Sequence, residues 1–366
     1  MIKVNAPYIT EDEINAVVEV LRSGQLAHGP IVEEFEREFS NYLGVPYTIA
    51  VSNGTVALYL ALKALGIGNG DEVIVPDFTF IATASMVVAA GAKPVLTDIN
   101  PRTYTIDPND VKKRITSRTR AIIVVHLYGH PAKIDELADI AKDNNLYLIE
   151  DCAQAHGAEF RGVKVGVFGD VSAFSFYATK NLTTGEGGAV VTKNREIAEK
   201  VKLLRNHGQV SRYYHDVIGW NFRLTSIQAA IGIQQLRKLD KMNSIRREIA
   251  RMYLEGLQDV DDIMLPIEMP WAKHVYHQFT IWVKEANYRN KLMEYLKSKG
   301  IQTSIHYPRP LHLQPALSKF SLSSSEYPNS LEASRHVLSL PMHPGLTESD
   351  VHYVIESIKN FFKNRK

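Results

Sequence analysis

The sequence predicts an α/β protein whose mostly parallel sheet is covered by helices on both faces and is followed by a smaller α+β region. Short apolar strand patterns alternate with helical patterns through the first half of the chain, and this alternation weakens after about residue 195. The chain has 366 residues, a length that suits two closely packed domains. We therefore expect a large domain over residues 1–245 and a small domain over residues 246–366.

The large domain is predicted from helix and strand patterns that follow each other in turn. Thr10 can cap a helix in which Glu13 stands three residues later, and apolar residues follow at helical spacing. Short apolar runs predict buried strands over 47–51, 72–76, 94–98, 121–126, 147–151 and 189–192. Amphipathic stretches predict helices over 54–65, 133–144, 197–206 and 226–252.

The small domain is predicted from a mixed pattern near the end of the chain. Strands are expected over 278–283 and 302–306, and helices over 289–299 and 348–362.

The bulk composition excludes several classes of protein. The net charge is only +2, so we expect no nucleic-acid surface. No window reaches the roughly 18 uninterrupted apolar residues of a membrane span, and the start shows no signal-peptide pattern. The single cysteine rules out an internal disulfide and favours the cytoplasm. No cluster of histidine and cysteine has zinc spacing, so we expect no metal site.

Three segments carry residues suited to chemistry. Gly54 and Thr55 follow a predicted strand and open a helix, where free N–H groups can bind an anion; such a turn is also an ordinary helix start. Asp151 ends an apolar strand, where α/β folds place ligands, although it could simply cap a helix. Lys180 stands between an apolar run and a glycine-rich turn, and a lysine tuned by such surroundings can form a Schiff base.

Taken together and in this order, these segments resemble the DegT/DnrJ/EryC1/StrS sugar aminotransferases. The resemblance covers nearly the whole chain. The segments that carry it are SNGTVAL at 52–58, VPDFTFIATA at 75–84, IEDCAQAHG at 149–157, FSFYATKNLTTGEGG at 174–188 and GWNFRLTSIQAAIG at 219–232. The resemblance implies the aspartate-aminotransferase-like fold (fold type I) and the cofactor pyridoxal 5′-phosphate (PLP).

The resemblance also implies roles for individual residues. Lys180 matches the lysine that forms the Schiff base with PLP, and Asp151 matches the aspartate that pairs with the pyridine nitrogen. Gln154 matches a glutamine that contacts the ring face or its phenolic oxygen, and Phe80 resembles the aromatic residue that stacks on the ring.

The phosphate of the cofactor is expected between two segments and a neighbouring subunit. Gly54, Thr55 and Ser175 match the family's phosphate-binding positions, and Asn221 matches an asparagine that reaches the phosphate of the neighbouring subunit. The resemblance therefore implies a homodimer with shared active sites.

The implied reaction is a two-stage transfer of an amino group. L-glutamate donates the group, which leaves the cofactor as pyridoxamine phosphate, and a keto sugar nucleotide then receives it. Lys180 is expected to move the proton between substrate and cofactor, a step that requires its neutral amine.

Substrate contacts are expected from four further residues. His306 and Tyr307 resemble a family segment near the sugar or the diphosphate, and the guanidinium groups of Arg212 and Arg223 match phosphate geometry. Both arginines are also compatible with structural ion pairs.

Alternatives stay open for the sugar carbon that receives the amino group and for the function of the protein. The segment 174–188 favours a 4-keto-6-deoxy sugar, whereas residues 207–215 and 306–308 have features of members that aminate a 3-keto sugar. A sugar dehydratase of the same fold would carry histidine in place of Lys180. A regulatory or binding protein on this fold is the alternative from another class, since fold alone does not define function.

Overall fold

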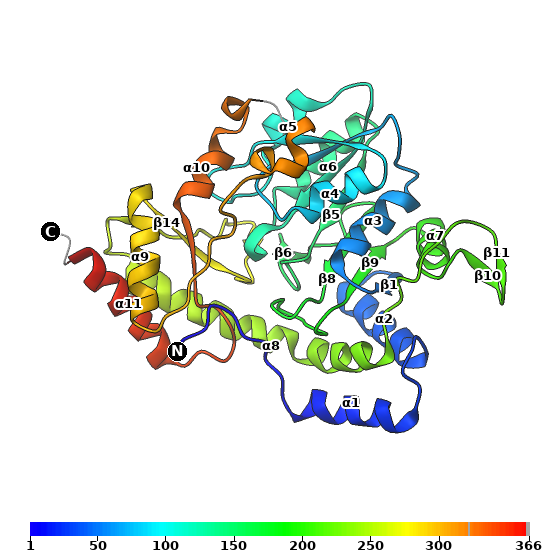
Figure 1. Ribbon diagram of the computed structural model, residues 1–366, viewed down its shortest axis with the longest axis horizontal. Helices are drawn as coiled ribbons and strands as arrows, with labels where there is room; N and C mark the ends of the chain where they lie inside the picture. Colours follow the sequence, from blue (N-terminus) through cyan, green and yellow to red (C-terminus); the bar gives the residue numbers. More distant parts are fainter. Residues whose placement is uncertain (321–322, 364–366) are drawn as a thin grey trace.

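The computed structural model describes residues 1–320 and 323–363, and Figure 1 shows a large sheet with its helices beside a smaller region that carries α9 and α11. Within the described residues, seven strands form the large sheet in the order β1-β9-β8-β5-β4-β2-β3. These are β1 (Tyr47–Val51), β2 (Glu72–Pro76), β3 (Lys93–Thr97), β4 (Thr119–Val125), β5 (Tyr147–Asp151), β8 (Val171–Ser175) and β9 (Gly188–Thr192). The mostly parallel sheet is confirmed: among these seven strands, β9 runs in the direction opposite to that of the other six.

Helices cover both faces of this sheet, as the alternating pattern predicts. One core lies under α2 (Pro30–Leu43), α5 (Pro108–Arg114), α6 (Ile134–Asp143) and the first part of α8 (Ser226–Leu257). The other core lies under α3 (Gly54–Ala64), α4 (Ala82–Ala89) and α7 (Arg195–Arg205). Near-continuous apolar strands are the expected composition of a sheet buried on both faces.

Helix α1 (Glu11–Ser23) packs along α8 and starts where the sequence predicts. The N–H of Thr10 donates to the Glu13 carboxylate at 2.8 Å, and Lys238 of α8 forms an ion pair with Glu13 at 2.6 Å. Burial tends to raise the pKa of Glu13, but the hydrogen bonds from Lys238 and Thr10 outweigh it and lower this pKa. Among the described helices, none is both long and apolar enough to cross a bilayer.

The smaller region has its own antiparallel sheet and core. Its strands are β12 (Ile263–Met264), β14 (Phe279–Val283) and β15 (Val337–Leu340), and its helices are α9 (Ala286–Ser298), α10 (Pro328–His336) and α11 (Glu348–Lys363). The last part of α8 enters this core through Tyr253 and Leu257. Because α8 runs through residue 245 and joins both cores, the domain boundary stays a prediction.

The remaining elements are short. They are β6 (Glu159–Phe160), β7 (Val163–Lys164), β10 (Gln209–Ser211), β11 (Tyr214–His215), β13 (Ala272–Lys273) and the 3₁₀ turns η1 (Leu127–Gly129), η2 (Leu311–Leu313), η3 (Pro315–Phe320) and η4 (Ser324–Glu326). The predicted strand over 302–306 is wrong. Ser304 forms only an isolated bridge with Ser339 of β15, because the chain then turns away and brings His306 and Tyr307 to a cavity.

The strand register sets where functional groups gather. Asp151 at the end of β5 lies opposite Val125 of β4 and opposite Ala173 of β8. Strand β8 ends at Ser175, which lies opposite Gly188 at the start of β9. The carboxyl ends of the parallel strands therefore form one edge, which is where open α/β sheets bind ligands.

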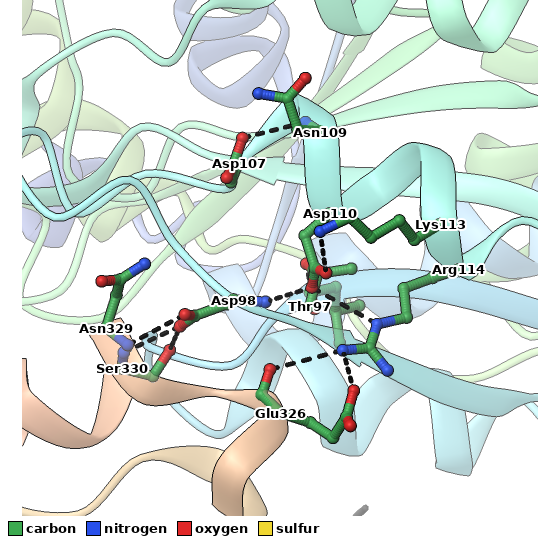
Figure 2. A network of polar contacts seen from close by, with 11 residues as sticks. Thr97, Asp98, Asp107, Asn109, Asp110, Lys113, Arg114, Glu326, Asn329 and Ser330 are labelled. Carbon is green, nitrogen blue, oxygen red and sulfur yellow. Dashed lines mark hydrogen bonds and ion pairs between the residues drawn. The ribbon is translucent and has the colours of Figure 1, made fainter.

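A polar network fastens α10 to the large sheet, and Figure 2 shows it from close by. The Asp98 carboxylate accepts hydrogen bonds from the N–H groups of Asn329 and Ser330 at 2.9 and 2.8 Å. N–H groups in the first turn of a helix have no intrahelical partner, and the side chain of Tyr327 at the N-cap of α10 does not form the capping hydrogen bond. Arg114 adds an ion pair to Glu326 at 3.1 Å. Asp98 thus serves as the cap of a helix more than 200 residues away in the chain.

We expect Asp98→Ala to destabilise the protein by about 2–3 kcal/mol, because it removes a carboxylate that accepts several hydrogen bonds in a buried position. Denaturant unfolding measures the change. Asp107→Ala is the matched control. The Asp107 carboxylate caps its own helix α5 by accepting from Asn109 N–H, and its loss should cost about 1 kcal/mol. Equal losses from both variants would contradict the proposed fastening.

Candidate active site

A cavity of about 710 Å³ lies at the carboxyl edge of the large sheet. It is enclosed by the start of α3, the start of α4, the ends of β5 and β8, the loop at Lys180, and segments of the smaller region. The structure brings nine of the predicted site residues to this cavity. They are Gly54, Thr55, Phe80, Asp151, Gln154, Ser175, Lys180, His306 and Tyr307.

One wall of the cavity is the N-terminus of α3. Asn53 at the N-cap accepts a hydrogen bond from Val56 N–H through its side chain at 2.9 Å and one from Ala57 N–H through its backbone at 3.1 Å. The N–H groups of Gly54 and Thr55 have no partner within the helix, so they can meet an anion together with the helix dipole.

The close approach of α3 to β8 depends on Gly54. A Cβ atom at this position would lie 2.5 Å from the Cβ of Ser175, a distance that no side chain tolerates. Glycine therefore lets the Ser175 hydroxyl lie beside the free N–H groups. The two segments form a cradle with hydrogen-bond donors from a helix start and a strand end.

Asp151 is the buried carboxylate of the cavity, with 6% of its surface exposed. Its Oδ1 accepts a hydrogen bond from Ala153 N–H at 3.1 Å, and its Oδ2 accepts one from the Thr83 hydroxyl at 3.0 Å. Burial raises the pKa of the Asp151 carboxyl, while these bonds and the positive charge of Lys180 oppose the rise.

Glu150 and His126 form a buried pair behind Asp151. The Glu150 carboxylate accepts hydrogen bonds from three backbone N–H groups of residues 166–169, each at 2.8 Å, and lies 3.0 Å from His126 Nε2. Because His126 Nδ1 accepts a hydrogen bond from Ala132 N–H at 3.0 Å, the ring proton is on Nε2 and points at Glu150. This network fixes the strand end from which Asp151 enters the cavity.

Lys180 follows β8 and lies in the same cavity. Burial lowers the pKa of its ammonium group to about 8, against the opposing effect of the Asp151 carboxylate. A lysine tuned in this way is neutral far more often near neutral pH than an exposed one, and so is available as a nucleophile or a base.

Gln154 links the large sheet to the smaller region. Its Oε1 accepts a hydrogen bond from Tyr128 N–H at 2.7 Å, and its Nε2 donates to the Tyr307 hydroxyl at 3.0 Å. The ring of Tyr307 lies 6.3 Å from that of Phe80, which is 55% exposed and borders the cavity. His306 Nδ1 lies 2.9 Å from Ser339 Oγ, and burial together with the charge of Lys180 lowers the pKa of His306 to about 4.

Three predicted residues lie outside this cavity. Arg212 is exposed in the β10–β11 hairpin, and Asn221 is exposed beside it, with backbone bonding to Asn206. Arg223 donates to the Asn206 side chain and borders a second cavity of about 510 Å³. Asn221 is expected to bind the phosphate in a neighbouring subunit, so a place outside the cavity of its own chain is compatible with that role. The phosphate contact of Asn221 and the substrate contacts of the two arginines stay predictions.

The sequence pattern did not single out several residues that line the cavity, among them Thr83, His277 and Asn53. Thr83 lies 68 residues from its partner Asp151, and no local pattern signals such a contact. His277 lies 96 residues from Asn181, whose Oδ1 is 3.1 Å from its ring nitrogen. His156 follows Gln154 closely in sequence, but its ring packs against Phe174 and Phe176 and is not part of the cavity lining.

Comparison with known proteins assigns the chain to a family. Residues 7–359 match the DegT/DnrJ/EryC1/StrS aminotransferase family. The chain is 43% identical to dTDP-3-amino-3,4,6-trideoxy-alpha-D-glucose transaminase of Streptomyces venezuelae, over 94% of this chain and 91% of that protein. It is 38% identical to GDP-perosamine synthase of Escherichia coli O157:H7, over 100% of this chain and 99% of that one.

Solved structures show the same fold. S. venezuelae DesV, in complex with a ketimine intermediate, superposes with a TM-score of 0.93 at 42% identity, over 96% of this chain and 94% of that one. Spr1654 of Streptococcus pneumoniae, 30% identical over 99% of this chain and 98% of that one, has a PLP form with a TM-score of 0.92 and also a pyridoxamine-phosphate form. The chain therefore belongs to the DegT/DnrJ/EryC1/StrS aminotransferase family and is a PLP-dependent sugar aminotransferase.

Proposed function

We propose that this enzyme transfers an amino group from L-glutamate to C4 of a 4-keto-6-deoxy sugar nucleotide. The observation that carries the transamination is the convergence of Lys180, Asp151 and the Gly54–Ser175 cradle in one cavity. The glutamate donor is supported by the family resemblance, and the 4-position by the segment 174–188.

The cavity fits PLP by three independent features. The start of α3 with Ser175 is a cradle for a phosphate, and a Cβ at Gly54 would clash with Ser175 and force the two segments apart. Asp151 is a buried carboxylate whose charge suits a protonated ring nitrogen. Lys180 is an amine of lowered pKa in the same cavity.

Different residues of this chain would bind the cofactor and transfer the proton. When bound, PLP supplies an electron sink for the charge left on carbon after proton removal. Gly54, Thr55 and Ser175 hold the phosphate, and Asp151 keeps the ring nitrogen protonated. Lys180 would hold the cofactor through its side-chain amine, and as a neutral amine it would take a proton from the substrate and return it as an ammonium group.

Other residues orient the ring and shape the space for the sugar. Phe80 and Gln154 border the ring position, since both line the cavity with Asp151 and Lys180. His306 and Tyr307 come from the smaller region and line the same cavity, where they can contact the sugar. Burial raises the pKa of Tyr307, so its hydroxyl stays protonated and can both donate and accept a hydrogen bond.

We propose Arg223 and Arg212 as partners of the diphosphate, and Asn221 as a ligand of the phosphate in a second subunit. The second cavity supports the role of Arg223, since it also contains Arg205 and Lys202. Exposed apolar side chains support the homodimer: Tyr213 and Ile218 near the hairpin are 80% and 84% exposed.

A second candidate is amination at C3 of a 3-keto sugar nucleotide. It is favoured by the 43% identity to the 3-amino-sugar transaminase, compared with 38% identity to the GDP-perosamine synthase.

The capture of PLP by the cofactor-free protein should accelerate as pH rises, with a midpoint near pH 8, because only the neutral amine of Lys180 reacts. Asp151→Asn removes the negative charge that stabilises the ammonium form, so its midpoint should be lower than that of the wild type. Stopped-flow absorbance in the same buffers compares the two proteins, so the titration of free PLP cancels. A midpoint near the ordinary lysine value of 10.5 would contradict the assignment of Lys180.

Shared active sites predict that two defective variants complement each other. Lys180→Ala should lower activity by roughly 10²–10⁴-fold, and Asn221→Asp should weaken PLP binding by placing a negative charge beside the phosphate. In mixed dimers one site combines an intact Lys180 with an intact Asn221, so random mixing should restore about a quarter of wild-type activity.

Activity is measured after the mixed variants are unfolded and refolded together, and each variant refolded alone is the control. Absence of any recovery, with both variants dimeric by light scattering, would rule out the sharing of Asn221.

A panel of dTDP- and GDP-linked keto sugars with L-glutamate tests the reaction itself. We expect an amine at C4 of the product, identified by NMR, and formation of 2-oxoglutarate. An amine only at C3 would establish the second candidate, and no transfer to any keto sugar would refute the proposed substrate class.

A further inference from the structure

We propose that Thr83 is a positioning residue that holds the Asp151 carboxylate ionised and oriented towards the ring nitrogen of PLP. The inference rests on the proposed role of Asp151 and adds to it a residue for which neither the sequence pattern nor the comparisons indicate a role. Thr83 borders the cavity and is almost fully buried, with 1% of its surface exposed.

Thr83 contacts the Asp151 carboxylate directly through a hydrogen bond. Within the described part of the chain, the Asp151 carboxylate accepts one hydrogen bond from the backbone, at Ala153, and one from a side chain, at Thr83. The Thr83 Oγ1 to Asp151 Oδ2 distance is 3.0 Å. With one donor on each oxygen, the plane of the carboxylate is fixed within the cavity.

The direction of the protons favours the ionised form. An ionised carboxylate can only accept hydrogen bonds, so the Thr83 hydroxyl must donate to it. The lone pairs of Thr83 Oγ1 are then free to accept from the Thr79 hydroxyl, which lies 3.3 Å away. Thr79 is buried as well, and the ordered chain Thr79→Thr83→Asp151 strengthens the final bond to the charged group.

The carboxylate needs such support because it is buried. Burial raises the pKa of Asp151, and the bond from Thr83 is among the contacts that oppose this rise. A neutral Asp151 would no longer stabilise the proton on the pyridine nitrogen. The bond from Thr83 therefore acts on the cofactor through Asp151, without contact between Thr83 and the reacting atoms.

Thr83 also lies in the same turn as Phe80, another residue that borders the cavity. Thr83 is the second residue of α4, and its N–H donates to the carbonyl of Phe80 at 3.2 Å. Phe80 borders the cavity, so the same turn that presents the aromatic ring supplies the donor to Asp151. One short segment therefore positions both the Phe80 ring and the Asp151 carboxylate.

The test compares Thr83→Val, which has nearly the same shape without a hydroxyl, with Thr83→Ser, which keeps the donor. We expect Thr83→Val to weaken PLP binding by about tenfold or more, as the loss of a hydrogen bond to a charged group implies. It should also move the pH midpoint of the visible PLP band upwards by about one unit, because a ring nitrogen without its proton makes the Lys180 linkage more basic. Thr83→Ser should stay within about twofold of the wild type in affinity.

Thr97→Val is the matched control. Its hydroxyl is also buried and donates to the Val75 carbonyl at 3.2 Å, but it does not contact Asp151. We expect Thr97→Val to change stability and to leave PLP affinity and the band midpoint within about twofold and a few tenths of a pH unit of the wild type. If Thr83→Val does not fold, Thr79→Val tests the same chain and should give a smaller shift in the same direction.

Asp151→Asn separates this inference from the proposed function. If Asp151→Asn weakens PLP binding and moves the band midpoint while Thr83→Val and Thr79→Val do neither, the role of Thr83 is refuted and that of Asp151 stands. If Asp151→Asn also behaves as the wild type, the cofactor role of Asp151 fails first. Loss in Thr83→Val with recovery in Thr83→Ser supports the inference.

Discussion

The parallel register of β4, β5 and β8 is the constraint on which the active site depends. Because Val125, Asp151 and Ala173 lie side by side, the chain leaves all three strands along one edge of the sheet. That edge receives the start of α3, which approaches β8 closely only because residue 54 is glycine. A slip of one residue in this register would turn the Asp151 side chain to the other face of the sheet and remove it from the cavity.

Two ionisable groups in the cavity are balanced against each other. Burial disfavours the charge on Asp151 and also the charge on Lys180, so it raises one pKa and lowers the other. Their mutual attraction opposes both shifts. The result is an amine whose pKa is about 8, close enough to neutrality for Lys180 to lose and regain a proton during a reaction cycle.

The smaller region contributes residues to the site that lie far in sequence from the strands of the large sheet. Tyr307 reaches Gln154, and the same chain segment leads to His312, whose Nδ1 lies 2.7 Å from the buried carboxylate of Asp77 at the end of β2. Further on, Asp98 caps α10. These polar contacts hold residues 307–312 and the first turn of α10 against the strand ends, so the cavity has a wall that the parallel sheet alone does not provide.

The alternation of strands and helices, the mostly parallel sheet and the family could be predicted from the sequence, because they depend on local apolar periodicity and on contiguous segments such as 174–188. It also indicated nine residues that the structure brings to one cavity. Three features became known only from the folded chain: residues 302–306 form no strand, β9 is antiparallel to its neighbours, and Thr83 donates a hydrogen bond to Asp151. The physical reason is that these features arise from hydrogen bonds between residues far apart in the chain, and a side chain alone does not reveal which distant partner satisfies it.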